Sequence, residues 1–400
     1  MVWEKVKLGD VVETNLGKML DKNKNKGEYK AYLANINVRW GSFDLSNLSQ
    51  MKFLDTENER YGLKYGDLLV CEGGEPGRCA IWKEQIPDMK FQKALHRIRT
   101  NNKVLDNRYL FYWFLLAGKK NALKQYFTGA TIMHMPADKL KSIIIDLPPI
   151  ATQTKIANIL SAYDDLIENN QKQIKLLEEA AQRLYKEWFV DFRFPGYENT
   201  EFVDGLPKGW KKQKLSEFGE IITGKTPSTL KNEYFGGDIP FVKIPDMHNN
   251  VFPIKTEMTL TEEGANSQKN KYIPKNSIIV SCIATVGLVN ISYKQCQTNQ
   301  QINSIILAKQ EYLYYLFFVL KGLKELLEGV GSNGATMTNV NKIKFGNIII
   351  ISPTEDLLNK FYNICKPVFD KILKLNLQIE NLTEARDRLL LKLMSGEIEV

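Results

Sequence analysis

Histidine and cysteine are scarce in this 400-residue chain, and their spacing excludes the common metal centres. The three histidines, His96, His134 and His248, lie far apart. The five cysteines are odd in number and include no C-x-x-C pair, so the sequence predicts neither a zinc site nor a disulfide framework. No Ser/His/Asp set is evident either. We therefore expect no catalytic residue and no metal ligand in this chain.

The sequence also lacks the glycine-rich motifs of nucleotide-binding enzymes. It has no G-x-x-x-x-G-K-[ST] loop and no G-x-G-x-x-G opening a βαβ unit. The segment EGGEPGRCA (72–80) has neither that spacing nor the lysine, and it predicts a turn between strands. These absences favour a protein that binds over one that carries out chemistry.

Long apolar runs are missing as well. The best one, EYLYYLFFVLKGL (311–323), is broken by Lys321 and is too short to span a bilayer. The first ten residues carry charge from Glu4 onward and contain no apolar signal core. We expect a reduced, cytoplasmic protein with no membrane partner.

The composition is that of a folded protein with a modest positive excess. Hydrophobic residues make up 44%, charged residues 25%, and the net charge is +8. This excess is compatible with a nucleic-acid partner but does not establish one.

The chain is duplicated. TGATIMHMPADKLKSIIIDLPPI (128–150) and SNGATMTNVNKIKFGNIIIISP (332–353) share Gly-Ala-Thr, the Ile run and the closing Pro in order. WEKVKLGDVVE (3–13) likewise aligns with WKKQKLSEFGE (210–220). The repeating unit is about half the chain, which indicates one duplication and not a solenoid.

Each copy begins with short β-rich runs interrupted by one or two helical stretches, which predicts a compact α+β globule. Each copy then ends in apolar residues spaced alternately four and three apart, the seam of a coiled coil. The predicted seam consists of Ile156, Leu160, Ile167, Asn170, Ile174, Leu177 and Leu184 in the first copy, and Ile372, Leu375, Ile379, Leu382 and Leu389 in the second.

We expect these two stripes to pack on each other within one chain as long antiparallel helices related by a pseudo-two-fold axis; a coiled coil between chains is the alternative. Arg386 interrupts the seam, and Pro367 is expected to kink or begin its helix. The predicted segments are a globule at 1–149, a helix at 150–192, a globule at 193–353 and a helix at 354–400.

Base recognition in DNA needs polar side chains on loops, and three copy-equivalent pairs of segments supply them. They are YLANINV (32–38) with FVKIPDM (241–247), FQKALHRIR (91–99) with TNQQINSII (298–306), and the two Gly-Ala-Thr loops. Candidate DNA-binding residues are Asn35, Asn37, Lys93, His96, Arg97, Thr131, Lys243, Asp246, Asn299, Gln300, Asn303 and Thr336. Scattered basic residues suit phosphate contact, although each one equally suits a solvated face.

The duplicated order of these features resembles the specificity subunit of type I restriction–modification systems. The resemblance rests on LPPIATQTKIANIL (147–160), the Gly-Ala-Thr segments, the duplicated heptads and the domain starts KVKLGDVVE and KQKLSEFGE. It covers the whole chain. The second joint, ISPTEDLLNK (351–360), departs from the pattern, because it keeps one Pro of two and lacks the Gln.

This resemblance implies two target recognition domains, each reading one half of a bipartite double-stranded DNA target. The divergence of the two copies predicts an asymmetric target. The helices would fix the unread gap and dock two methyltransferase (M) subunits, and motor–nuclease (R) subunits would supply cleavage. No cofactor is expected in this chain; S-adenosylmethionine, ATP and Mg would be bound by the partners.

Two other hypotheses stay open. One is a protein-interaction adaptor with a coiled-coil rod that never binds DNA. The other is a self-contained DNA-modifying enzyme, against which the missing motifs argue.

Overall fold

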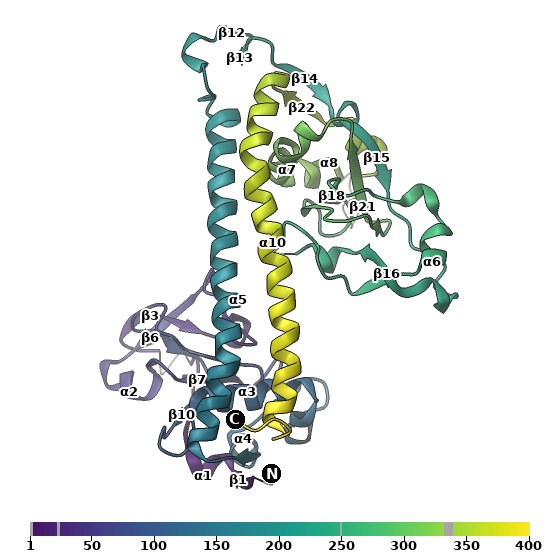
Figure 1. The fold of residues 1–400 in the computed structure, drawn as a ribbon. Helices are drawn as coiled ribbons and strands as arrows, with labels where there is room; N and C mark the ends of the chain where they lie inside the picture. Colours follow the sequence, from purple (N-terminus) through teal and green to yellow (C-terminus); the bar gives the residue numbers. More distant parts are fainter. Residues whose placement is uncertain (1–2, 22–24, 249, 332–338) are drawn as a thin grey trace. The chain divides into compact units, whose positions relative to one another are not determined.

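A computed structural model describes residues 3–21, 25–248, 250–331 and 339–400, and its contacts divide the chain into two units. Unit 1 comprises Met1–Ile167 with Asn381–Val400, and unit 2 comprises Glu168–Glu380. The long helices α5 (Ile150–Tyr185) and α10 (Glu355–Met394) each belong in part to unit 1 and in part to unit 2 (Figure 1). The units therefore divide the chain differently from the predicted segments, which assigned each helix a segment of its own.

Unit 1 is built on two sheets. The four-stranded sheet has the order β2-β10-β7-β8 and is antiparallel throughout. The three-stranded sheet has the order β6-β3-β9, with β3 antiparallel to β6 and parallel to β9. A separate pair joins β1 to β11. The bounds are β1 Glu4–Lys7, β2 Val12–Leu16, β3 Glu28–Leu33, β6 Ser49–Phe53, β7 Leu68–Cys71, β8 Cys79–Ile81, β9 Lys90–Phe91, β10 Leu95–Thr100 and β11 Ile144–Leu147.

Unit 2 repeats these two sheets and the separate pair. Its sheets have the orders β15-β21-β18-β19 and β17-β16-β20, and β14 pairs with β22. Its β16 is antiparallel to β17 and parallel to β20, as β3 is to β6 and β9. The bounds are β14 Lys211–Lys214, β15 Gly219–Thr223, β16 Phe235–Val242, β17 Met258–Leu260, β18 Ile278–Ser281, β19 Val289–Ile291, β20 Gln297–Thr298, β21 Ile302–Leu307 and β22 Ile349–Ser352. The predicted duplication and α+β class are thus confirmed.

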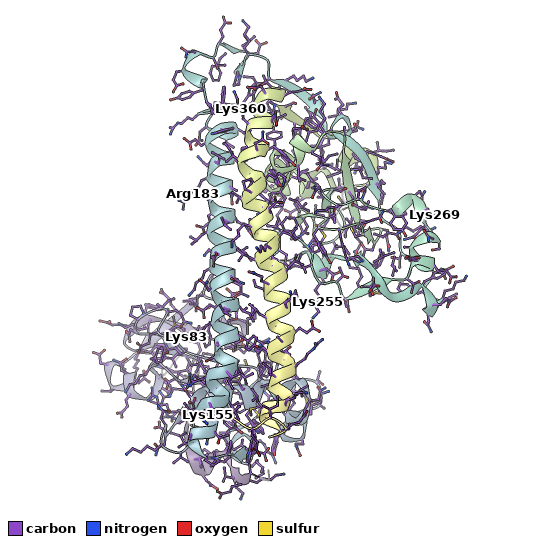
Figure 2. All side chains as sticks on the ribbon, viewed as in Figure 1. Lys83, Lys155, Arg183, Lys255, Lys269 and Lys360 are labelled. Atoms are coloured by element: carbon purple, nitrogen blue, oxygen red, sulfur yellow. The ribbon has the colours of Figure 1, made fainter. Side chains whose placement is uncertain are left out.

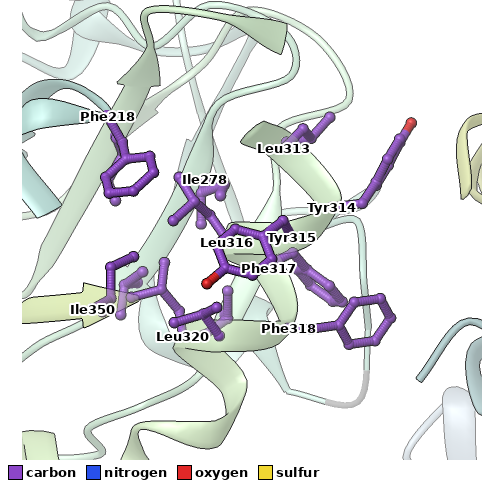
Figure 3. Close-up of a cluster of buried hydrophobic side chains, with 14 of the residues drawn as sticks. Phe218, Ile278, Leu313, Tyr314, Tyr315, Leu316, Phe317, Phe318, Leu320 and Ile350 are labelled. Carbon is purple, nitrogen blue, oxygen red and sulfur yellow. The ribbon is translucent and has the colours of Figure 1, made fainter. Parts of the chain in front are cut away.

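Each unit packs one helix of its globule against its main sheet. In unit 1 this is α3 (Asn107–Lys119), whose Tyr109 hydroxyl donates to the Asp146 carbonyl (2.9 Å). In unit 2 it is α7 (Leu313–Gly322), whose Tyr315 hydroxyl donates to the Ile351 carbonyl. Figure 3 shows α7 side chains around Leu316 packed against Ile278 and Ile350. The sequence predicts helical stretches at 107–126 and 311–329, and α3 and α7 lie within them.

The long helices form where the heptads predicted them. α5 begins directly after Pro148–Pro149, where the preceding prolines suit a helix start. α10 begins at Glu355 and continues through Pro367, so that proline does not begin the helix. Pro367 lies on the exposed side of α10. Because proline has no backbone N–H, one carbonyl of the preceding turn loses its helical hydrogen bond, and on this side it is accessible to water.

The predicted seam residues face the interior to different degrees. Ile156, Leu160, Asn170, Ile372 and Leu375 are buried. The remaining predicted seam residues are half-buried: Ile167, Ile174, Leu177, Leu184, Ile379, Leu382 and Leu389. In unit 1, Ile156 and Leu160 share a core with Leu390 and Leu393, so the helices pack within one chain.

In unit 1 a polar network crosses the helix pair. Arg386 of α10 donates to Asp164 of α5 (Nη1–Oδ1 2.5 Å), and the Tyr112 hydroxyl of α3 donates to the same carboxylate (2.6 Å). Arg386 also contacts Asp387, which accepts from Lys119. In unit 2 the copy-equivalent positions hold Ala181 and Phe369, both buried. Arg386 therefore interrupts the apolar seam because it neutralises a partly buried carboxylate.

Candidate nucleic-acid interface

Four segments of unit 1 meet at one end of its main sheet, and we call them loop cluster 1: residues 34–37, 72–77, 92–94 and 128–134. The amide of Glu72 donates to the Ala94 carbonyl (2.8 Å), and the amide of Met135 donates to the Glu72 carbonyl (2.7 Å). Gly73 forms a β-bridge with His134, and the Asn35 side-chain amide donates to the Gly73 carbonyl (3.1 Å). All three kinds of segment singled out in the sequence are therefore adjacent in space, with the EGGEPG turn among them.

Unit 2 holds the equivalent loop cluster 2, which we define as residues 243–248, 282–287, 299–301 and 339. The amide of Cys282 donates to the Gln301 carbonyl (2.8 Å), and the amide of Val340 donates to the Cys282 carbonyl (2.9 Å). Ile283 forms a β-bridge with Asn339. Bond for bond, this is the backbone frame of loop cluster 1.

The same frame requires the same backbone conformation at the turn between the main-sheet strands. Gly77 (φ 89°) and Gly287 (φ 87°) occupy equivalent left-handed positions, and their amides donate to Cys71 and Ser281. Gly74 (φ 79°) corresponds to Ala284, which adopts φ 64°. A left-handed alanine costs about 1–2 kcal/mol, so the frame holds this turn against a local preference.

The side chains on the two frames differ. In loop cluster 1 the turn reads EGGEPG, and the other segments carry Lys93 and Thr131, both exposed, and the half-buried Asn35. In loop cluster 2 the turn reads CIATVG, and the exposed Gln300 accepts a hydrogen bond from the Thr226 hydroxyl (2.9 Å). Two similar frames thus present unrelated chemical surfaces.

Two predicted DNA-binding residues of unit 1, Asn37 and Arg97, are instead structural. Asn37 is 5% exposed; its side chain accepts from the Ala34 amide and donates to the carbonyls of Asp44 and Asn47. Arg97 is 1% exposed, and its guanidinium donates to the carbonyls of Glu59, Arg60 and Gly62. Side chains buried and bonded in this way do not reach a DNA groove.

His96 is also buried and instead anchors loop cluster 1. Its Nε2 lies 2.8 Å from the Met135 carbonyl, so Nε2 carries the proton, and the buried Nδ1 has no hydrogen-bond partner among the described residues. Burial lowers the pKa of His96 below its usual value. In unit 2 the side-chain amide of Asn303 makes the equivalent bond, to the Val340 carbonyl (3.0 Å). His96 and Asn303 are therefore corrected from base readers to loop anchors.

Unit 2 requires a similar correction. Asp246 accepts from the amides of Lys243 and Glu257 and so holds its own loop. The Lys243 ammonium is paired with Glu257 (2.6 Å). Asn299 is 8% exposed, and its amide donates to Gln301. Thr336 lies outside the described residues.

Four predicted residues remain accessible: Asn35, Lys93, Thr131 and Gln300. Sequence reasoning missed the exposed Ile36, Ile132 and Met133 of loop cluster 1, because it sought only polar groups. Several exposed lysines make no ion pair in the described part of the chain. They include Lys120 and Lys124 in unit 1 and Lys225, Lys269 and Lys275 in unit 2, where Lys269 projects beside α6 (Glu262–Asn266) (Figure 2).

The thiols offer little reactivity. Burial raises the pKa of Cys71 and Cys282 to about 11 and that of Cys296 and Cys365 to about 12, so they are thiols at neutral pH. Among the described residues, no three His, Cys, Asp or Glu side chains are placed to share a metal ion. No helix in the same residues combines the length and apolar character needed to cross a bilayer.

The comparison with known families decides what the two frames are. The family model "Type I restriction modification DNA specificity domain" matches residues 2–179 and again residues 207–381. The chain belongs to this family. Both matches include one recognition globule and part of a long helix, as the duplication predicted.

Individual relatives agree with the family assignment. The HindI specificity subunit of Haemophilus influenzae is 31% identical over 99% of both chains. The MjaIX specificity subunit of Methanocaldococcus jannaschii is 31% identical over 84% of this chain and 78% of its own. A solved S subunit from M. genitalium has the same fold, with a TM-score of 0.59 at 16% identity, covering 98% of this chain and 96% of that one. This chain is a non-catalytic DNA specificity subunit.

Proposed function

We propose that this specificity subunit reads a bipartite, asymmetric DNA target, with loop cluster 1 on one half-site and loop cluster 2 on the other. The observation that carries the proposal is the repeated backbone frame with unrelated side chains. A frame kept twice indicates two similarly mounted surfaces, and the different side chains indicate two different base sequences. A symmetric target would instead require similar surfaces.

Within each cluster the exposed groups divide by their chemistry. Lys93, Lys120 and Lys124 in unit 1, and Lys225 in unit 2, suit phosphate oxygens, which set affinity and register without specifying sequence. Asn35, Thr131 and Gln300 can donate to and accept from base edges in the major groove. The buried anchors His96 and Asn303 hold the loops that carry these groups.

The partners and cofactors follow from the family. Two methyltransferase subunits would dock on α5 and α10, where Leu166, Leu176, Ile364 and Leu377 are exposed. S-adenosylmethionine would be bound by those subunits, and ATP and Mg by motor–nuclease subunits. The relatives' names, as type I restriction enzyme specificity subunits, support this assembly.

The test is a genome-wide map of methylated adenines from cells carrying this chain with its methyltransferase. We expect one gapped motif that disappears when the chain is deleted. The double variant Lys93→Ala/Thr131→Ala should alter the bases required in one half of the motif or lower the extent of methylation. Gln300→Ala should have the same kind of effect through the other half. Lys64→Ala, an exposed lysine outside both clusters, is the matched control and should leave the motif unchanged.

Two outcomes would contradict the proposal. If Gln300→Ala and the Lys93/Thr131 pair altered the same half of the motif, the assignment of one unit per half-site would fail. If deletion left the map unchanged and the purified chain showed no salt-sensitive DNA binding, the protein-interaction adaptor would be the better description.

A further inference from the structure

Loop cluster 1 carries apolar side chains where a DNA-reading surface is expected to be polar. Ile36 is 66% exposed, Ile132 63% and Met133 45%. Isolated exposed aliphatic residues are ordinary on protein surfaces, but these three lie on segments tied to one another. The link is Gly73, which bonds to Asn35 beside Ile36 and bridges to His134 beside Met133.

These side chains are not needed by the fold. Among the described residues, the core clusters of unit 1 include none of Ile36, Ile132 and Met133. The position equivalent to Ile36 in unit 2 is Pro245, also exposed. The backbone frame is therefore formed without a long aliphatic side chain at that position, and the apolar character belongs to the surface of loop cluster 1.

The surroundings of these residues are cationic. Lys93 lies within loop cluster 1, and Lys120 and Lys124 lie on the segment that leads into residues 128–134. Leu123 of that segment lies against Gly77 of the turn, which places the lysine-bearing stretch beside the cluster. Exposed cations around an apolar patch complement a polyanion with an apolar feature on its surface.

Duplex DNA offers one such feature to a loop in the major groove. The C5-methyl group of thymine is the only apolar group among the base edges there, and aliphatic side chains contact it. We propose that Ile36, Ile132 and Met133 recognise thymine methyl groups in the half-site read by unit 1. This inference rests on the proposed function and adds the chemical class of base that loop cluster 1 selects.

The experiment replaces thymine by deoxyuridine, one position at a time, in a cognate duplex bound to the full chain with its methyltransferase. The substitution removes only the methyl group and leaves base pairing intact. Burial of one methyl-sized group contributes about 0.8 kcal/mol, so we expect about fourfold weaker binding at one or more thymines of one half-site. Thymines in the unread gap are the internal control and should show no effect.

A matched pair of variants connects this effect to the loop. Ile132→Ala should weaken binding to the thymine duplex and abolish the further loss caused by deoxyuridine. Ile144→Ala removes an exposed side chain of β11 outside the cluster and should leave the deoxyuridine effect at its wild-type size.

The outcomes separate this inference from the proposed function. Salt-sensitive, sequence-specific binding that is indifferent to every deoxyuridine overturns the thymine-methyl inference and leaves the proposed function intact. Indifference to deoxyuridine together with weaker binding by Ile132→Ala also overturns it, since that result indicates a wedge between base steps. Absence of any sequence-specific binding overturns the proposed function itself.

Discussion

At the scale of single residues, one buried position shows how the two copies diverge without losing their frame. His96 and Asn303 occupy equivalent positions in β10 and β21. The His96 ring bonds to the Met135 carbonyl, and the Asn303 amide bonds to the Val340 carbonyl. The imidazole of His96 leaves one buried nitrogen without a hydrogen bond in the described residues, which destabilises the folded state relative to the amide of Asn303. The Nδ1 of His96 is buried and has no hydrogen-bond partner in the part of the chain that the structure describes, so protonating it would bury a charge without an acceptor there.

This difference predicts a pH dependence located at His96. Its pKa is lowered in the folded state, so below the unfolded value of about 6.5 the unfolded chain binds a proton that the folded chain does not. The free energy of unfolding is therefore unaffected by His96 protonation above about pH 6.5 and decreases as the pH falls towards the folded-state pKa of His96. Each pH unit in that window removes up to about 1.4 kcal/mol.

His96→Asn copies the unit 2 anchor and should flatten this part of the curve. The measurement is urea denaturation of both proteins at pH 7.5 and 5.5. We expect the wild type to lose more stability than the variant between the two pH values; the nearby Glu72 and His134 remain in both proteins and cancel in the difference. Equal losses would show that His96 takes up its proton in the folded state.

Residue type alone could not separate anchors from readers. The strand LHRIRT looks polar and accessible in sequence, yet β10 is the second strand of a sheet with a hydrophobic core on each face. A strand covered on both faces has no solvent side, so His96 and Arg97 are both buried. Only the tertiary structure reveals that covering, which is why the predicted readers of these strands, His96 and Arg97 in β10 and Asn303 in β21, are buried.

At the scale of elements, the long helices were the most predictable part of the fold. Heptad spacing reports which residues face a neighbouring helix, so the sequence anticipated the location of α5 and α10. The pairing of short strands such as β9 and β20 was not predictable, because two residues carry no periodicity. The duplication compensated in part, because it required any pairing in one copy to recur in the other.

The polar network of unit 1 yields a prediction about helix packing. Arg386→Met removes the cation that neutralises Asp164, whose carboxylate is 29% exposed. Breaking a well-buried pair costs about 3–5 kcal/mol, and partial exposure should reduce the loss here to about 2 kcal/mol. We expect unit 1 to unfold at a lower urea concentration. Hydrogen exchange of the α3 amides would measure this midpoint.

A double variant is the control for this prediction. Arg386→Met with Asp164→Leu removes both charges and imitates the apolar packing at Ala181 and Phe369 in unit 2. It should be less destabilised than the sum of the two single variants. Additive losses would mean that the Arg386–Asp164 contact contributes no coupling energy and that α10 is held by its apolar seam alone.

At the scale of the whole molecule, the net charge of +8 acquires meaning only through where the unpaired lysines lie. Many lysines of this chain are committed to ion pairs, such as Lys309 with Glu355 and Lys360 with Asp356. Lys93 and Lys124 are exposed, and no ion pair involves them in the described residues. We infer that charge of this kind sets affinity for any duplex, whereas the loop side chains set the preference among duplexes.

The salt dependence of DNA binding can separate the role of the lysines in affinity from the role of the loop side chains in sequence preference. Replacing Lys93 and Lys124 together by Gln should reduce the slope of log K against log salt by about 2, since each phosphate contact contributes about 0.9. Binding to cognate and unrelated duplexes should weaken by the same factor, because phosphates carry no sequence information. Lys64→Gln, outside the cluster, should change neither quantity. A variant whose slope stayed the same while its ratio of cognate to unrelated affinity fell would place these lysines on bases, and the phosphate role proposed for them would have to be withdrawn.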